Sequence, residues 1–390
     1  MKRLNTGISR IQPSATLAIT SQAAALKKQG LKICAFAAGE PDFETPDFIS
    51  EACIEALRAG QTKYTPVAGI AELTKAISAK LARDNGLDYK PSQIVVSCGA
   101  KHSLALIFQT LLNPGDEVII PAPYWLSYPE MVAVAGGVPK FVEATWEQDF
   151  KITPAQLEAA IGPKTVAVVI NSPSNPSGMM YSPAELKALG EVAVKHDLWI
   201  VSDEIYEKMV YGDNTFASMA SFGPEFYEHT ITVNGFSKAY SMTGWRLGYT
   251  AAPLGFIKAM NALQSHCASA PTTFSQYGGV AALEKGDEAI AKMVKAFDER
   301  RQRIYELVSA IPGVKCPKPQ GAFYILPNIA AFGMDSLTFS SKLLEQKQVA
   351  VVPGIAFGND SCVRLSYACS MANIEEGMKR FAEFCASVKI

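Results

Sequence analysis

A lysine next to a hydroxyl group marks the stretch of this sequence best suited to covalent chemistry. Lys238 directly follows Ser237 and precedes Arg246 by eight residues. Apolar runs at 229–233 and 247–251 flank the stretch, which predicts a loop at a sheet edge, where α/β active sites are usually found. A lysine amine with its ordinary pKa of about 10.4 is protonated at neutral pH and is a poor nucleophile. The chemistry therefore requires a lowered pKa or an aldehyde that forms a Schiff base with Lys238.

Two other segments carry groups that would complement an aldehyde cofactor. Besides its aldehyde, pyridoxal phosphate presents a pyridine nitrogen, a phenolic oxygen and a phosphate. The apolar run 198–202 ends at Asp203, and a carboxylate buried there requires a cationic partner such as a protonated pyridine. At 94–112 a strand, a turn with Gly99 and Ala100, and a helix start would aim backbone N–H groups at an anion. Capping of a following helix is the alternative role for Asp203.

The runs Asn234-Gly235-Phe236-Ser237-Lys238 and Met242-Thr243-Gly244-Trp245-Arg246 resemble the cofactor-lysine motif of fold-type I pyridoxal-phosphate enzymes. Within the class I aminotransferases they are similar to the prokaryotic-type aspartate aminotransferases, and the resemblance covers almost the whole chain. It implies pyridoxal 5'-phosphate as cofactor and Lys238 as the residue that forms the aldimine and moves the proton. The implied cofactor contacts are Gly99, Ala100, Lys101, Ser237 and Arg246 around the phosphate, Trp125 against the ring, Asp203 at the pyridine nitrogen, and Asn175 and Tyr206 at the phenolic oxygen.

The resemblance also implies substrate contacts and a dimer. Arg364 would grip the α-carboxylate with its two-pronged guanidinium. Because no arginine or lysine occurs from 264 to 276, where animal-type enzymes supply an arginine, Lys101 remains for the distal carboxylate. The other implied substrate contacts are Gly39, Trp125, Asn175, Thr16 beside Lys101, and Phe323 at the entrance. Tyr64 would reach the phosphate of the neighbouring subunit, which makes a homodimer the active unit.

Each of these residues also has an ordinary structural explanation. The explanations are a plain turn at Gly39, an exposed loop tyrosine at Tyr64, a solvated lysine at Lys101, a core tryptophan at Trp125, an asparagine turn at Asn175 and a surface-strand arginine at Arg364. A cis bond before Pro176 is expected as a way to fix the Asn175 side chain.

The elements that position these residues alternate between strands and helices. Seven strand-like runs between 94 and 251 predict an α/β three-layer sandwich with a mostly parallel seven-stranded sheet, covered by helices on both faces. A helix is expected from about Pro13, and long charged helices begin near 285. We therefore expect residues 46–284 to form the large cofactor-binding domain. Residues 1–45 and 285–390 would form a smaller α+β domain, a discontinuity implied by the resemblance.

Composition narrows the class of function. The chain has 390 residues, 36 basic and 37 acidic, so no basic excess is present to bind nucleic acid. The four histidines do not cluster as metal ligands, and no run of about 18 apolar residues predicts a membrane span. No secretory leader follows the first residues, and the eight cysteines lack Cys-x-x-Cys spacing. We expect a cytoplasmic protein with reduced thiols and no metal.

The expected reaction is ping-pong transamination between L-aspartate and 2-oxoglutarate, which gives oxaloacetate and L-glutamate. Prephenate or aromatic substrates are the alternative within the same chemistry. Elimination or cyclopropane formation would keep the cofactor and change the reaction. A transcription regulator built on this fold would need an added DNA-binding domain, and a cofactor-free binding module would leave Lys238, Asp203 and Arg246 without a role.

Overall fold

The computed structural model describes residue 11 and residues 15–388 of the chain, and these form alternating helices and strands. The helices are α1 (Ala15–Lys28), α2 (Asp47–Arg58), α3 (Ala71–Asn85), α4 (Ala100–Leu111), α5 (Ser127–Val134), α6 (Pro154–Ala160), α7 (Pro183–Lys195), α8 (Pro224–His229), α9 (Leu254–Cys267), α10 (Thr273–Lys285), α11 (Asp287–Ser309), α12 (Ser336–Lys347) and α13 (Met371–Ser387). The strands are β1 (Cys34–Ala35), β2 (Ile94–Ser97), β3 (Glu117–Ala122), β4 (Val138–Glu143), β5 (Thr165–Asn171), β6 (Trp199–Asp203), β7 (Thr230–Gly235), β8 (Gly248–Ala251), β9 (Tyr324–Ile325), β10 (Val349–Ala350), β11 (Val352–Pro353) and β12 (Val363–Ser366).

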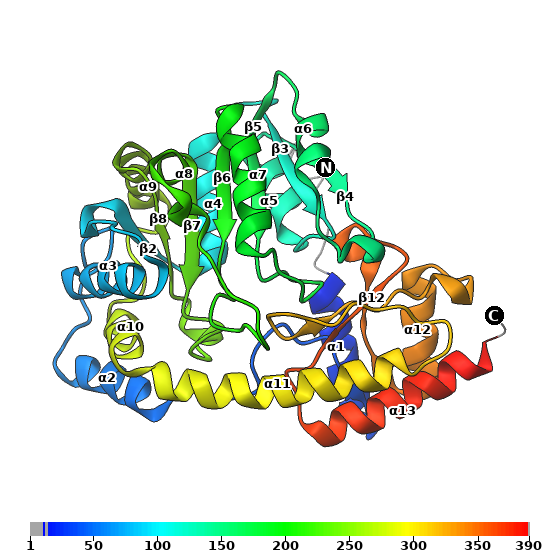
Figure 1. Ribbon diagram of the computed structural model, residues 1–390. Helices are drawn as coiled ribbons and strands as arrows, with labels where there is room; N and C mark the ends of the chain where they lie inside the picture. Colours follow the sequence, from blue (N-terminus) through cyan, green and yellow to red (C-terminus); the bar gives the residue numbers. More distant parts are fainter. Residues whose placement is uncertain (1–10, 12–14, 389–390) are drawn as a thin grey trace, which may run out of the picture.

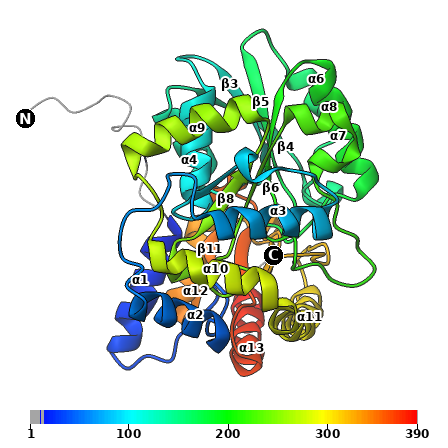
Figure 2. The ribbon, with the colours of Figure 1, turned by 90° about the vertical axis from the view of Figure 1, so that its left-hand side faces the viewer.

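The central sheet has seven strands in the order β2-β8-β7-β6-β5-β3-β4. Every neighbouring pair is parallel except those of β8, which runs antiparallel to both β2 and β7. Helices cover both faces of this sheet (Figures 1 and 2). The predicted α/β three-layer sandwich with a mostly parallel seven-stranded sheet is therefore confirmed.

Side chains that alternate along the strands fill two different layers of the core. Val95 packs with α4, α5 and α9 on one face, whereas its neighbours Ile94 and Val96 pack with α3 and α10 on the other. On β5, Val169 and Ile170 divide in the same way between α5 and α7. Because both faces are buried, the strands read as continuous apolar runs rather than as an apolar and polar alternation.

Local signals set where the helices begin. At α7 the Ser182 side chain accepts a hydrogen bond from the Glu185 backbone N–H, and the Glu185 carboxylate accepts one from the Ser182 N–H. Pro183 occupies the first helical position, where its missing N–H costs nothing. The helix predicted from Pro13 corresponds to α1, which begins at Ala15; Pro13 itself lies outside the described residues.

The two ends of the described chain meet in a smaller structural unit. β1 pairs in parallel with β10, and β11, β12 and β9 form a three-stranded antiparallel sheet. Around them lie α1, α12 and α13, while α11 runs along the base of the molecule beneath both the large sheet and this unit (Figure 1). The pairing of β1 with β10 agrees with a small domain made from both ends of the sequence. Its boundaries at 45 and 285 stay a prediction.

Two further observations concern the surface and the thiols. None of the helices in the described part of the chain is long and apolar enough to cross a membrane. The eight cysteines are free thiols.

Candidate active site

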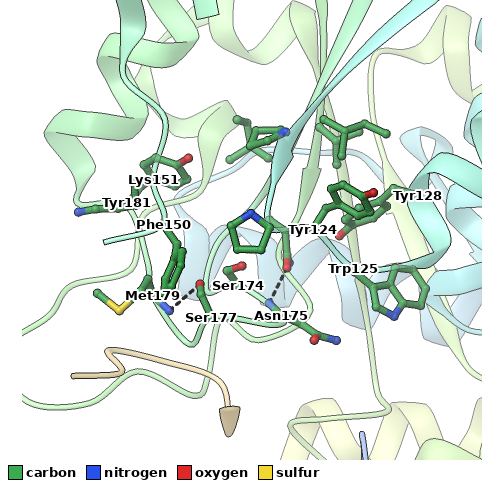
Figure 3. Close-up of a pocket in the computed structure, with 16 residues that line it drawn as sticks. Tyr124, Trp125, Tyr128, Phe150, Lys151, Ser174, Asn175, Ser177, Met179 and Tyr181 are labelled. Atoms are coloured by element: carbon green, nitrogen blue, oxygen red, sulfur yellow. Dashed lines mark hydrogen bonds between the residues drawn. The ribbon is translucent and has the colours of Figure 1, made fainter. Parts of the chain in front are cut away.

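The largest group of predicted site residues converges on one cavity of about 460 Å³ between the carboxyl ends of the large-sheet strands and the smaller unit. Its lining includes Gly39, Ala100, Lys101, Trp125, Asn175, Asp203, Tyr206, Ser237, Lys238, Arg246 and Arg364. A narrower hollow adjoins it and shares Trp125, Tyr128, Asn171 and Asn175 (Figure 3). Parallel strands deliver their following loops to one edge, so residues from five loops meet there.

Lys238 follows β7 and points its amine across the cavity. The Nζ group donates a hydrogen bond to the Gly39 carbonyl and lies 5.8 Å from the centre of the Phe323 ring. Burial is the main cause that lowers the pKa of Lys238 to about 8; Glu40 and Asp203 oppose this shift, whereas Arg364 and Arg246 contribute to it. The protein thus supplies the lowered pKa that a nucleophilic lysine needs.

Asp203, the last residue of β6, is buried, and Lys238 is the positively charged side chain that acts on its carboxylate. Its Oδ2 accepts a hydrogen bond of 2.6 Å from the Tyr128 hydroxyl, and its Oδ1 accepts one of 3.3 Å from the Ile205 N–H. Burial raises the pKa of Asp203 to about 6, although both hydrogen bonds lower it. A turn rather than a helix follows, so the helix-capping alternative is wrong. A buried carboxylate at the wall of a cavity is suited to a cationic ligand.

Tyr206 and Tyr324 form a hydrogen-bonded pair on the wall nearest the smaller unit. Their hydroxyl oxygens lie 3.0 Å apart, and burial raises the pKa of both, so each remains a neutral donor. Phe323, expected to line the entrance, is fully buried and packs edge-on against Tyr206. Tyr324, the next residue, lines the cavity in its place.

A cup suited to an anion lies where β2 leads into α4. Gly99 adopts a left-handed conformation with φ of +87°, and a Cβ there would lie 2.6 Å from Arg246 Nη2. Arg246 donates to the Thr243 carbonyl at 2.8 Å and to the Cys98 carbonyl at 3.4 Å, which holds its guanidinium beside the start of α4. Ser237 and the first residue of α4, Ala100, complete the cup. Backbone N–H groups, the helix dipole and a guanidinium all favour negative charge there.

Arg364 on β12 is completely buried, which excludes the surface-strand alternative. Its guanidinium lies over the rings of Tyr324 and Phe357, at 4.5 and 4.9 Å from their centres. Nη1 donates to Asn175 Oδ1 at 3.0 Å and Nη2 donates to the Ala37 carbonyl at 2.9 Å. The Nε–H has no hydrogen-bond partner among the described residues. A buried cation with an unsatisfied donor at a cavity wall is suited to an anionic ligand.

Asn175 and Trp125 both line the cavity and the adjoining hollow (Figure 3). Its Oδ1 accepts from Arg364, so its NH₂ group is the part of the amide that remains to donate. The expected cis bond before Pro176 is confirmed, and cis bonds also precede Pro123 and Pro173.

Lys101, in the first turn of α4, reaches over the Trp125 ring at 5.0 Å from its centre. Burial and the charge of Arg246 lower the pKa of Lys101. The residue as a whole is exposed, so the alternative of a solvated lysine stays open. Thr16, its expected neighbour, belongs to α1, but its side chain lies outside the described residues.

Tyr64 stands apart from this cavity. Its side chain is 95% exposed, on a loop beside residues 270–274. Within one chain it contributes nothing to the cavity, which is the arrangement that the expected exchange between subunits requires.

Sequence reasoning missed three residues that hold the site together. Tyr128 donates to Asp203, and Tyr324 pairs with Tyr206. Asn171, at the end of β5, donates to the Asp203 carbonyl at 3.0 Å and accepts from the Asn175 N–H at 2.9 Å. The polar end of an otherwise apolar strand was the available signal for Asn171; no local signal marks Tyr128.

Known proteins resemble this chain over its full length. The family model of class I and II aminotransferases matches residues 32–381. The aspartate aminotransferase of Geobacillus stearothermophilus is 50% identical, covering 97% of both chains, and the aspartate/prephenate aminotransferase of Cereibacter sphaeroides is 46% identical, covering all of both.

Solved structures agree with these relatives. The crystal structure of the Rhizobium meliloti aspartate aminotransferase superposes with a TM-score of 0.96 at 40% identity, covering all of both chains. The Thermus thermophilus aspartate aminotransferase with maleate gives a TM-score of 0.94 at 43% identity, covering 98% of this chain and 100% of that one. With its cavity of lysine, buried aspartate and buried arginine, the chain belongs to the class I and II aminotransferases.

Proposed function

We propose that this protein is a pyridoxal-phosphate-dependent aspartate aminotransferase that exchanges the amino group between L-aspartate and 2-oxoglutarate. The observation that carries the proposal is the convergence of Lys238, Asp203 and Arg364 on one cavity. Several relatives, among them the one from Geobacillus stearothermophilus, bear the name aspartate aminotransferase. Oxaloacetate formed from aspartate and 2-oxoglutarate by the purified protein is the direct test.

The residues of the cavity fit pyridoxal phosphate group by group. Asp203, with its pKa raised to about 6 by burial, lacks the cationic partner that a protonated pyridine nitrogen would provide. The amide of Asn175 and the hydroxyl of Tyr206 would serve the phenolic oxygen. The cup of Gly99, Ala100, Ser237 and Arg246 would hold the phosphate, and Trp125 would lie against the ring. When bound, the cofactor carries the amino group and withdraws electrons from the substrate α-carbon.

The chain's own residues would orient the substrate and move its proton. Arg364, which lines the cavity, would bind the α-carboxylate with its guanidinium. The Lys238 amine, whose pKa burial lowers to about 8, is partly neutral near pH 7 and would take the proton from the α-carbon. The cavity would hold one substrate at a time, and the first product would leave before the second substrate binds, so the kinetics would be ping-pong.

Lys101 is proposed to bind the distal carboxylate of aspartate. It lies in the cavity wall beside Trp125, and no arginine or lysine occurs from 264 to 276 to take this role. Losing a charge-assisted hydrogen bond costs about 1.5–3 kcal/mol. Lys101→Ala should therefore lower kcat/KM for aspartate roughly ten- to a hundredfold while phenylalanine, which lacks this carboxylate, is spared. Equal losses for both substrates would assign Lys101 to the cofactor or the fold.

Prephenate is a second candidate substrate. The relatives from Aquifex aeolicus and Cereibacter sphaeroides, 48% and 46% identical, are named for aspartate and prephenate together. A lysine is a flexible point charge rather than a rigid fork, so Lys101 can follow carboxylates at different distances from Arg364. Rates with prephenate and aspartate, measured separately on parent and Lys101→Ala, decide this: both should fall together if Lys101 serves both substrates.

The active unit is proposed to be a homodimer in which Tyr64 reaches the phosphate of the second copy. The Tyr64 side chain is 95% exposed, on a loop whose backbone is hydrogen-bonded to Gln264 and Gln276, and this arrangement supports the proposal. An active monomer in sedimentation would exclude it. Opening and closing between the large domain, 46–284, and the small domain, 1–45 with 285–390, would admit the substrate.

A further inference from the structure

The loop that carries Tyr64 is held by two buried glutamines from two different helices. Gln276 on α10 accepts from the Ile70 N–H at 2.8 Å and donates to the Thr65 hydroxyl at 3.2 Å. Gln264 on α9 donates to the Val67 carbonyl at 2.7 Å. Both glutamine side chains are fully buried. An exposed tyrosine therefore projects from a loop whose backbone is fixed from inside the molecule.

Gln264 makes a second contact that Gln276 does not make. The same Nε2 that reaches Val67 also donates to the Val96 carbonyl of β2 at 2.8 Å. Tyr64 lies three residues before Val67, and Gly99 of the anion cup lies three residues after Val96. The Gln264 amide thus links two segments: the loop that carries Tyr64, and strand β2, which leads into the anion cup of the same chain. The Ala68 carbonyl, which accepts from the Val96 N–H at 3.0 Å, reinforces this junction.

The orientation of the Gln264 amide is determined by its surroundings. Both partners are carbonyl oxygens, so only the NH₂ group can face them, and a flipped amide would place three oxygens together. The Oε1 atom is buried and has no partner among the described residues. That unpaired acceptor destabilises the fold, whereas the NH₂ group supplies the donor that the Val67 and Val96 carbonyls need. A side chain that only filled this space would leave both carbonyls unpaired, so the amide is what links the loop to β2.

We propose that Gln264 is a positioning residue that sets the Tyr64 loop relative to the phosphate cup. The inference rests on the proposed function, because it requires that Tyr64 contacts the phosphate of the partner subunit. Through its two carbonyl contacts, the Gln264 side chain positions Tyr64, which would reach the partner subunit's site, and the anion cup of its own subunit.

The test compares cofactor release from the loaded dimer in four proteins: the parent, Gln264→Met, Tyr64→Phe and the double variant. Release is followed by loss of the absorbance band of bound pyridoxal phosphate. Gln264→Met should release it roughly three- to tenfold faster, less than the loss of a whole charged hydrogen bond. When Tyr64→Phe is already present, Gln264→Met should speed up release only about twofold, because only its effect on the cup through β2 is left. Loss of the two carbonyl contacts should lower the urea midpoint of the cofactor-free form equally in both Tyr64 backgrounds, so this cost to the fold cancels in the comparison.

Gln276→Met is the matched control, because it frees the same loop without touching β2. Its effect on release should vanish in the Tyr64→Phe background. Two results would overturn the inference. One is a folded Gln264→Met that releases the cofactor at the parent's rate; the other is a Gln264→Met effect that is as large in Tyr64→Phe as in the parent. If Gln264→Met does not fold, Gln264→His, which keeps one N–H donor, undergoes the same comparison. A parent that takes up no pyridoxal phosphate, or that sediments as a monomer, refutes the proposed function instead.

Discussion

Replacing Asp203 with asparagine should make the cofactor-free protein more stable at neutral pH while removing most of its activity. Burial raises the pKa of Asp203 from 3.8 to about 6. Between these values the folded state binds more protons than the unfolded state, so the free energy of unfolding falls as the pH rises through this window. Two pKa units correspond to about 3 kcal/mol, which the parent loses in full above about pH 7. Asparagine has no charge to bury and keeps an oxygen for the Tyr128 hydroxyl; its NH₂ group would face the Ile205 N–H, a cost that does not change with pH.

The assay is urea unfolding of both cofactor-free proteins at one protein concentration, because a dimer's stability depends on concentration. The variant's advantage should grow by about 2 kcal/mol between about pH 4.5 and about pH 7.5. Asp213→Asn, which removes an exposed carboxylate, should follow the parent at every pH. With pyridoxal phosphate bound, the parent should be the more stable protein, because the Asp203 carboxylate can pair with a pyridinium and a neutral asparagine cannot. A stability difference that does not change with pH would refute the reasoning.

Three further perturbations follow from the same site. Lys238→Ala should abolish turnover and leave the circular dichroism spectrum unchanged, since it removes both the amine that binds the aldehyde and the proton carrier; substantial residual activity would contradict the assignment. Arg246→Ala should weaken retention of pyridoxal phosphate on dialysis because the cup loses its guanidinium, and equal retention would remove Arg246 from the phosphate site. The rate of pyridoxal phosphate uptake by the cofactor-free protein should rise about tenfold per pH unit below pH 8 and level off above it, because the pKa of Lys238 is lowered to about 8 and only the neutral amine attacks. Rapid-mixing absorbance measures this rate, and a rate that does not change with pH would contradict the prediction.

The sequence predicted the large sheet well because its strands are buried on both faces. Uninterrupted apolar runs such as 198–201 are visible in the sequence alone, and the polar residues that follow them, Asp203 among them, fall at one sheet edge because the strands are parallel. Tyr128 could not be found in this way, because it contacts Asp203 from a helix 75 residues earlier in the chain. Its role depends on how α5 packs against the sheet.

The choice between Phe323 and Tyr324 shows a second limit. Phe323 directly precedes β9, whose two residues are too few to show an alternation, and the Phe323 and Tyr324 rings lie only 4.7 Å apart. The register came from the pairing of Ser366 with Tyr324, which is a tertiary contact. Prediction from sequence can therefore miss the cavity-lining residue by one position where the strand is this short.

The length of α11 has a consequence for how sequences of this kind can vary. The helix has 23 residues, about 35 Å at 1.5 Å per residue. Near its start Met293 contacts Ser241, close to Lys238, and farther on Phe297 packs against Phe323 and Arg301 donates to the Pro319 carbonyl at 2.9 Å. One inserted residue would rotate everything beyond it by about 100°, and a whole inserted turn would shift it by about 5.4 Å. Insertions and deletions should therefore be absent between Met293 and Arg301 and should accumulate in the loops that carry no such contacts.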